Sequence, residues 1–266
     1  MDDILVIGKN RIAYKLFGKG SPIVFLHGFL ESKEIWSDIA KMLSNQHRIL
    51  LIDLPGHGKS ELQSDQITMI EMAESVKAVL HYLNFENSVV FGHSMGGYVG
   101  LELTKLMKIN LALIHSNFWN DDIEKRNDRD RVVKVVKQNS SLFIQTAIPN
   151  LFYHVNKDNQ KENIAKLIAG ASKMDNNIIS SMTIGMRDRK NNEIVLENQK
   201  IAIVQGEFDP IIPENKMKLY LKKIKNRPYY ISIANCGHMG FLEQPETFFK
   251  AIQSVIDKFC RIKVNN

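Results

Sequence analysis

Residues 88–97 read SVVFGHSMGG, an apolar run of strand length followed directly by a glycine-rich hexapeptide. Apolar residues then recur at helical spacing, so this hexapeptide is expected to join a strand to a helix. In that context Gly92-His93-Ser94-Met95-Gly96 matches the G-x-S-x-G nucleophile elbow, a sharp turn that exposes the serine hydroxyl. Side chains in place of Gly92 and Gly96 would collide with neighbouring backbone. Ser94 is therefore the candidate nucleophile, with a plain glycine turn as the alternative.

A serine hydroxyl is a weak nucleophile and needs a base whose tautomer is fixed by a third group. His238 lies just past the last expected strand and is the candidate base. Asp209 follows an expected strand at 201–205 and is the candidate acid, with Glu207 as its nearest competitor. The chain order Ser, Asp, His is the order associated with this elbow.

The loop after the third expected strand reads His27-Gly28-Phe29 and takes the place of the second half of an oxyanion hole. The backbone N–H groups of Phe29 and Met95 are the expected donors, because Gly28 allows close backbone approach and Met95 opens a helix. His27 and Gly28 are candidate substrate contacts. Glycine turns that bind no ligand are the alternative.

The order of apolar segments predicts an α/β fold with a mostly parallel eight-stranded sheet flanked by helices. Strands are expected at 4–7, 11–17, 22–26, 48–54, 88–91, 111–115, 201–205 and 228–233. Helices are expected at 35–43, 68–83, 95–108, 214–224 and 247–259, with Thr68 and Glu71 as a capping box.

Residues 119–199 interrupt this alternation with a polar stretch of helical periodicity. We expect an inserted helical cap there, over a core made of residues 1–118 and 200–266. Its apolar residues give it an inward surface, and Phe143 and Phe152 are candidate substrate contacts. The alternative is that these residues only form the cap's own small core.

The composition narrows the possible partners and location of this 266-residue chain. Its net charge is +6, but the positive residues are dispersed, so a nucleic-acid partner is not expected. Two cysteines, no signal peptide and no long apolar run favour a cytoplasmic protein without a membrane partner. No metal-ligand cluster or phosphate loop occurs, so no metal and no cofactor are expected. The oligomeric state stays open.

Five segments together resemble the α/β-hydrolase superfamily, and in particular its small capped esterase-like and carbon-carbon-hydrolase-like members. These segments are 25–28, 53–60, 92–97, 206–209 and 237–238. The resemblance spans most of the chain but leaves the cap unmatched. Relatives with aspartate at the elbow, such as haloalkane dehalogenases and epoxide hydrolases, differ from this chain at Ser94.

The leading hypothesis is a serine hydrolase that cleaves carboxylic esters of small or medium substrates through an acyl-enzyme on Ser94. Carbon-carbon or thioester cleavage, or a lyase step, on the same triad is one alternative. A ligand-binding protein that keeps the pocket without turnover is another. The natural substrate is not fixed by the sequence, because pocket walls set it.

Overall fold

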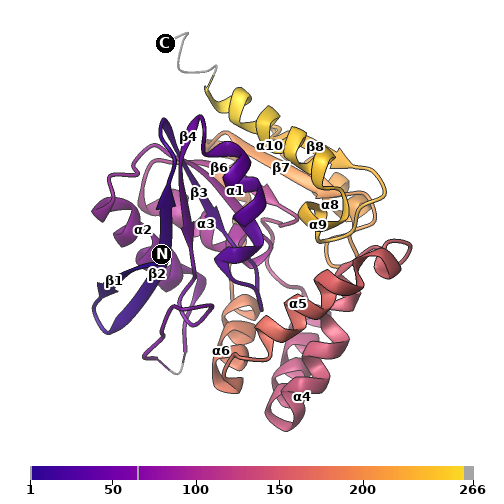
Figure 1. The fold of residues 1–266 in the computed structure, drawn as a ribbon. Helices are drawn as coiled ribbons and strands as arrows, with labels where there is room; N and C mark the ends of the chain where they lie inside the picture. Colours follow the sequence, from indigo (N-terminus) through magenta and orange to yellow (C-terminus); the bar gives the residue numbers. More distant parts are fainter. Residues whose placement is uncertain (1, 65, 261–266) are drawn as a thin grey trace.

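The computed structural model describes residues 2–64 and 66–260 and builds them around an eight-stranded sheet (Figure 1). The strand order is β1-β2-β4-β3-β5-β6-β7-β8. The strands are β1 (Asp3–Ile7), β2 (Asn10–Phe17), β3 (Ser21–Leu26), β4 (His47–Ile52), β5 (Val89–His93), β6 (Asn110–Ile114), β7 (Ile201–Gly206) and β8 (Tyr229–Ile233). β2 is antiparallel to β1 and β4, and all other pairs are parallel. The expected mostly parallel sheet is confirmed.

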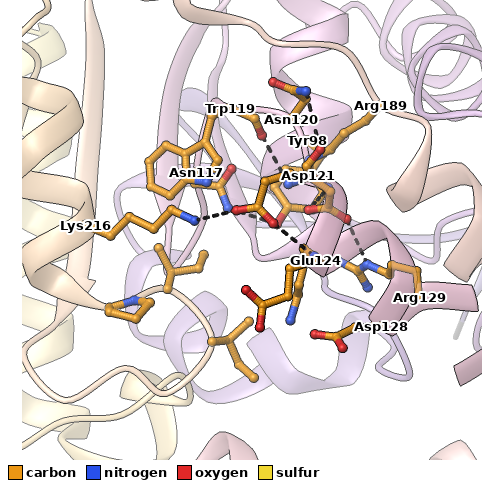
Figure 2. A pocket seen from close by; sticks show the side chains of 15 residues that line it. Tyr98, Asn117, Trp119, Asn120, Asp121, Glu124, Asp128, Arg129, Arg189 and Lys216 are labelled. Carbon is orange, nitrogen blue, oxygen red and sulfur yellow. Dashed lines mark hydrogen bonds and ion pairs between the residues drawn. The ribbon is translucent and has the colours of Figure 1, made fainter. Parts of the chain in front are cut away.

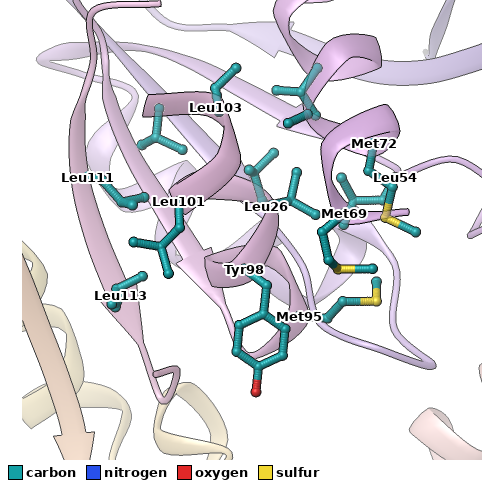
Figure 3. Packing of buried hydrophobic residues seen from close by; sticks show 14 of the residues in the cluster. Leu26, Leu54, Met69, Met72, Met95, Tyr98, Leu101, Leu103, Leu111 and Leu113 are labelled. Atoms are coloured by element: carbon teal, nitrogen blue, oxygen red, sulfur yellow. The ribbon is translucent and has the colours of Figure 1, made fainter. Parts of the chain in front are cut away.

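Helices cover both faces of the sheet because its central strands are apolar on both sides. In β3, Val24 and Leu26 face one cluster of buried residues, while Ile23 and Phe25 face the other. The first cluster lies under α2 (Met69–Tyr82), α3 (Met95–Leu106) and α8 (Glu214–Leu221). Figure 3 shows its leucines packed between strands and α3. The second lies under η1 (Lys33–Trp36), α1 (Ser37–Leu43) and α10 (Pro245–Cys260).

Local signals set several helix ends. Thr68 caps α2 by accepting a hydrogen bond from the Glu71 N–H, and the Glu71 side chain bonds back to the Thr68 N–H, so the capping box is confirmed. Pro245 stands at the start of α10, where its missing N–H costs no helical hydrogen bond. A further short helix, α9 (Gly240–Glu243), was not expected, because four residues are too few to show periodicity.

Helices also fill the chain between β6 and β7. They are α4 (Ile123–Ala147), η2 (Pro149–Leu151), η3 (Lys157–Gln160), α5 (Lys161–Ala171), α6 (Asn176–Arg187) and α7 (Glu193–Asn198). α4, α5 and α6 lie together at one end of the molecule, at the bottom of Figure 1. α7 adds Val195 and Leu196 to the cluster beneath α3, to which α6 also contributes Met182 and Met186. The exact boundary between core and cap stays a prediction.

Among the described helices, we find none with the length and apolarity that a membrane span requires.

Candidate active site

Ser94 occupies the turn between β5 and α3 in a backbone conformation that is rare for any residue with a side chain. Its φ is 47° and its ψ is −113°. A Cβ on Gly92 would lie 2.5 Å from the Gly96 carbonyl oxygen, and one on Gly96 would lie 2.6 Å from the His27 carbonyl oxygen. The Ser94 N–H donates to the Ile114 carbonyl at 2.9 Å. The surrounding backbone thus holds a strained turn in place.

Asp209 and His238 form a buried pair at the same edge of the sheet, after β7 and β8. The Nδ1 of His238 lies 2.8 Å from Oδ2 of Asp209. The other Asp209 oxygen accepts from the N–H groups of Ile211 and Ile212, each at 2.9 Å. Burial alone would raise the pKa of Asp209, but attraction to His238 and hydrogen bonds hold it below its ordinary value. Asp209 is therefore an anion that keeps a proton on His238 Nδ1.

Residues 234–239, which carry the candidate base His238 and are called the base loop below, lie beside the elbow. The ring of His238 is centred 5.0 Å from the ring of His93, the residue before Ser94. Within the described part of the chain, no hydrogen bond joins the Ser94 hydroxyl to His238. Contacts between a nucleophile and its base are often long before substrate binds.

The expected oxyanion donors are the backbone N–H groups of Phe29 and Met95. Neither takes part in a hydrogen bond among residues 2–64 and 66–260. The Gly28 N–H differs, because it donates to a Glu31 carboxylate oxygen at 2.5 Å. Met95 is the first residue of α3, where the helix dipole favours negative charge. Phe29 and Met95 thus present free donors beside the elbow.

His27 uses both ring nitrogens within the protein. Its Nε2 accepts from the Leu54 N–H at 3.0 Å, so Nδ1 carries the proton and donates to the Gly28 carbonyl at 2.8 Å. Burial lowers the pKa of His27, which keeps the ring neutral. The ring supports the loop of residues 27–29, which carries the expected oxyanion donor Phe29 and is called the oxyanion loop below, and the expected contact of His27 with substrate stays a prediction.

A buried pair that the sequence reasoning missed joins the elbow to both flanking loops. His93 Nδ1 lies 2.9 Å from Glu31, and its Nε2 donates to the His238 carbonyl at 3.0 Å. Burial alone would lower the pKa of His93, but Glu31 raises it above the ordinary value; burial alone would raise the pKa of Glu31, but His93 holds it below. Since both ring nitrogens face acceptors, His93 is an imidazolium. Its only sequence signal is its place inside the elbow motif.

The competing acid Glu207 points elsewhere. It is exposed, and its carboxylate accepts from the Asn235 N–H at 3.1 Å. His115, which follows β6, lies 3.6 Å from Asp209, but its Nδ1 accepts from the Gly206 N–H. Burial lowers the pKa of His115 to about 4, so it is neutral near pH 7.

The two candidate phenylalanines lie in different places. Phe143, in α4, is half-buried in a cluster that also contains Phe29 of the oxyanion loop and the next residue, Leu30. Phe152, just after η2, is only 2% exposed and packs in the cluster beneath the base loop with Cys236 and Phe241. Phe143 thus packs against the loop that follows β3, whereas Phe152 lines a pocket that also includes Asp209.

A polar pocket of about 210 Å³ lies beside α3, near the start of α4 and the end of α6 (Figure 2). Asp121 precedes α4 and Arg189 follows α6, and their side chains pair at 2.8 Å. Arg129 adds a second bond to Asp121 at 3.1 Å, and Arg189 stacks 4.1 Å above the ring of Tyr98. This network ties the start of α4 and the end of α6 to α3.

Comparison with known proteins places this geometry in context. Residues 21–108, from β3 through α3, match the family model described as alpha/beta hydrolase fold. An esterase from Thermogutta terrifontis superposes with a TM-score of 0.88 at 25% identity, covering 97% of this chain and 99% of that one. A pimeloyl-[acyl-carrier protein] methyl ester esterase from Wigglesworthia glossinidia brevipalpis is 27% identical, over 92% of this chain and 98% of its own length. A 2-hydroxy-6-oxo-6-(2'-aminophenyl)hexa-2,4-dienoic acid hydrolase from Metapseudomonas resinovorans is 22% identical, over 94% and 89%.

Proposed function

We propose that this chain is a serine hydrolase that cleaves carboxylic esters of small or medium substrates. The chain belongs to the α/β-hydrolase superfamily. The observation that carries this proposal is the strained Ser94 turn at the same sheet edge as the 2.8 Å pair of His238 and Asp209. That combination is what nucleophilic catalysis by serine requires.

The first half of the proposed reaction forms an acyl-enzyme. His238 Nε2 takes the proton from the Ser94 hydroxyl as its oxygen attacks the ester carbonyl carbon. The resulting oxyanion accepts hydrogen bonds from the N–H groups of Phe29 and Met95. The tetrahedral intermediate collapses, and the alcohol leaves with the proton from His238.

The second half releases the acid. His238 deprotonates a water molecule, which attacks the acyl carbon, and the second tetrahedral intermediate expels the Ser94 oxygen as His238 returns the proton. Throughout, Asp209 keeps the Nδ1 proton of His238 in place and stabilises the imidazolium that forms in each half. No cofactor enters these steps.

The helices between β6 and β7 are proposed to act as a cap. This segment leaves the sheet after β6, at the carboxyl edge that carries Ser94 and Asp209, where open α/β sheets bind ligands, and it returns to the opposite edge at the start of β7. Phe143 is proposed to border the substrate pocket together with the His27-Gly28 loop. A small-molecule substrate and a cytoplasmic location belong to the same proposal.

A second candidate is carbon-carbon bond hydrolysis on the same triad, which the Metapseudomonas resinovorans relative favours by its named activity. The third candidate is a ligand-binding protein without turnover. It does not explain the strained Ser94 backbone, because such strain usually serves a functional site. Ester turnover and labelling of Ser94, measured together, separate these three candidates.

The test combines a fluorophosphonate probe with a panel of aryl esters of increasing acyl length. We expect labelling of Ser94 and ester hydrolysis, and a loss of roughly 10⁴-fold or more in kcat for Ser94→Ala. His238→Ala is expected to lose about as much, and the double variant scarcely more, because the residues act as a unit. Labelling without ester turnover would favour the carbon-carbon alternative, and near-normal turnover by Ser94→Ala would refute the assignment.

A further inference from the structure

Glu243, in the short helix α9, is a buried carboxylate without a cation beside it. Glu243 is 8% exposed, and it takes part in no ion pair among the described residues. Its Oε1 accepts from the N–H groups of Gly237 and Met239, at 3.0 and 3.2 Å. These are the residues on either side of His238. Hydrogen bonds to a charged acceptor are stronger than those to a neutral one. The Glu243 carboxylate therefore holds the backbone on both sides of His238 firmly in place.

The other carboxylate oxygen reaches a different part of the chain. Oε2 of Glu243 accepts from the Tyr153 N–H at 2.9 Å and from the Asn156 side-chain amide at 2.8 Å. Both donors belong to residues 151–156, which we call the linking segment and which connects η2 to η3 between β6 and β7. One side chain therefore bonds to the base loop with one oxygen and to the linking segment with the other.

Two more hydrogen bonds join the same partners. The His238 N–H donates to the Leu151 carbonyl at 2.8 Å, and the Asn156 amide also donates to the Asn235 carbonyl at 2.9 Å. The three consecutive N–H groups of residues 237, 238 and 239 are thus all bound, and the His238 carbonyl accepts from His93. In Figure 1 the chain leading into α5 approaches the loops that follow β7 and β8.

We propose that Glu243 is a positioning residue, which fixes the backbone of His238 and couples it to the linking segment of the helices over the site. This inference rests on the proposed function, because it assigns His238 the role of base. Glu243 itself does not touch the reacting atoms. Its effect is exerted through the distance and angle at which His238 meets Ser94 and Asp209.

The substitution Glu243→Gln tests this assignment with little change in shape. A glutamine keeps one acceptor oxygen but turns an NH₂ group toward two N–H donors, so two of the four hydrogen bonds are lost. Because a base misplaced by about 1 Å costs on the order of 100-fold in rate, we expect kcat to fall by about 10- to 100-fold with little change in KM.

Two other variants bracket this result. Asn156→Ala removes only the side-chain link to the base loop and is expected to lower kcat in the same direction by less. Glu214→Gln is the matched control, because Glu214 also accepts several hydrogen bonds, from Lys218, Tyr230 and Ser232, but contacts no residue of the base loop. It is expected to leave kcat unchanged.

A spectroscopic readout separates positioning from simple stability. The proton between His238 Nδ1 and Asp209 is expected to give a far-downfield ¹H NMR signal in the wild-type protein. The signal should shift or broaden in Glu243→Gln at a temperature where the variant is fully folded, and stay unchanged in Glu214→Gln. The assignment is overturned if the signal and kcat match those of the wild type, or if kcat falls only as far as the folded fraction does.

The same measurements keep the two proposals apart. The NMR signal requires no turnover, so its change in Glu243→Gln supports the positioning role even if no ester is cleaved. Failure of the proposed function is read instead from an unlabelled Ser94. Should Glu243→Gln fail to fold, Asn156→Ala decides, and an unchanged signal and kcat in that variant would overturn the coupling.

Discussion

Asp209 uses its two carboxylate oxygens for separate tasks. One is bound by the N–H groups of Ile211 and Ile212, so it holds the loop, and the other faces His238 Nδ1. One residue, Asp209, thus both holds a turn and takes the proposed role of orienting the base. The loop bonds fix the carboxylate before any chemistry begins, so the tautomer of His238 is set by the folded backbone.

Replacement of Asp209 by asparagine is expected to preserve the loop and cripple the reaction. The amide oxygen can still accept from Ile211 and Ile212, but the NH₂ group then faces His238 Nδ1 and favours the tautomer that cannot act as base. We expect kcat to fall by roughly 10⁴-fold, as in the serine-protease precedent. Steady-state hydrolysis of the best aryl ester, at equal melting temperature, measures it.

Glu207→Gln is the matched control for that substitution. Its carboxylate accepts one hydrogen bond from the Asn235 N–H at the surface, so activity should change little. If Glu207→Gln proves crippling and Asp209→Asn mild, the acid has been assigned to the wrong residue.

The sequence predicted those candidate site residues that lie in a recognisable local pattern. Ser94 lies in a motif with strand and helix on either side, and Asp209 and His238 each follow a strand in the expected order. Glu31 escaped prediction because its partner His93 is 62 positions away along the chain. Glu243 escaped for the same reason, because Tyr153 is 90 positions distant. Such pairs exist only once the sheet brings its loops together.

The spacing of apolar residues along the sequence predicts the strands and the long helices. Where each of them ends is decided by backbone hydrogen bonds in the folded structure. The strand expected at 48–54 stops at Ile52, because the Leu54 N–H bonds to the His27 ring. The strand expected at 88–91 runs on to His93, paired with Ile114 of β6. The packing of α4–α6 could not be predicted from the sequence, because the apolar face of an amphipathic helix does not specify which surface it packs against.

The proposed cap supplies the next prediction, which compares Phe143 with Phe152. Phe143→Ala alters the cluster that contains Phe29 and Leu30, so we expect the relative kcat/KM across acyl lengths to change, by about 1 to 3 kcal/mol per methylene. Phe152→Ala empties a site in the core and is expected to cost about 3 to 5 kcal/mol of stability. The ester panel and thermal melts measure both effects.

Opposite behaviour would change the interpretation of the helices. A uniform loss across all esters in Phe143→Ala, in step with its melting temperature, would mean that Phe143 only packs. A changed acyl preference in Phe152→Ala would return that residue to the substrate pocket.

In the whole molecule, buried charge gathers in the loops at the carboxyl edge of the parallel strands. Lys33 pairs with Asp53 at 2.6 Å between the loops after β3 and β4, and Arg189 pairs with Asp121 after β6. Buried ion pairs add little net stability, yet breaking one by removing a partner typically costs about 3 to 5 kcal/mol. They therefore fix which loops meet at the site more than they strengthen the fold.

The pair of Glu31 and His93 makes the stability of the whole protein depend on pH in a defined window. The pKa of Glu31 is lowered from 4.5, so its contribution is present above that pH and is lost as pH falls through the lowered value. The pKa of His93 is raised from 6.5, so its contribution is complete below that pH and is lost as pH rises through the raised value. Both contributions are complete between pH 4.5 and 6.5.

We therefore expect Glu31→Gln to lower the melting temperature most near pH 5.5, with a gap to the wild type that narrows as pH rises to 8.5. Other groups around His93 do not produce this trend: burial keeps His27 and His115 neutral, and Asp209 stays ionised. Glu34→Gln is the control, because the half-exposed Glu34 carboxylate pairs mainly with Lys15 at 2.7 Å, with Lys33 farther away at 3.9 Å, and exposed pairs contribute about 0 to 1 kcal/mol. Melting curves at constant ionic strength measure the gap. A gap that stays constant from pH 5.5 to 8.5 would mean that His93 is neutral in the folded protein and that the pair is held by hydrogen bonding alone.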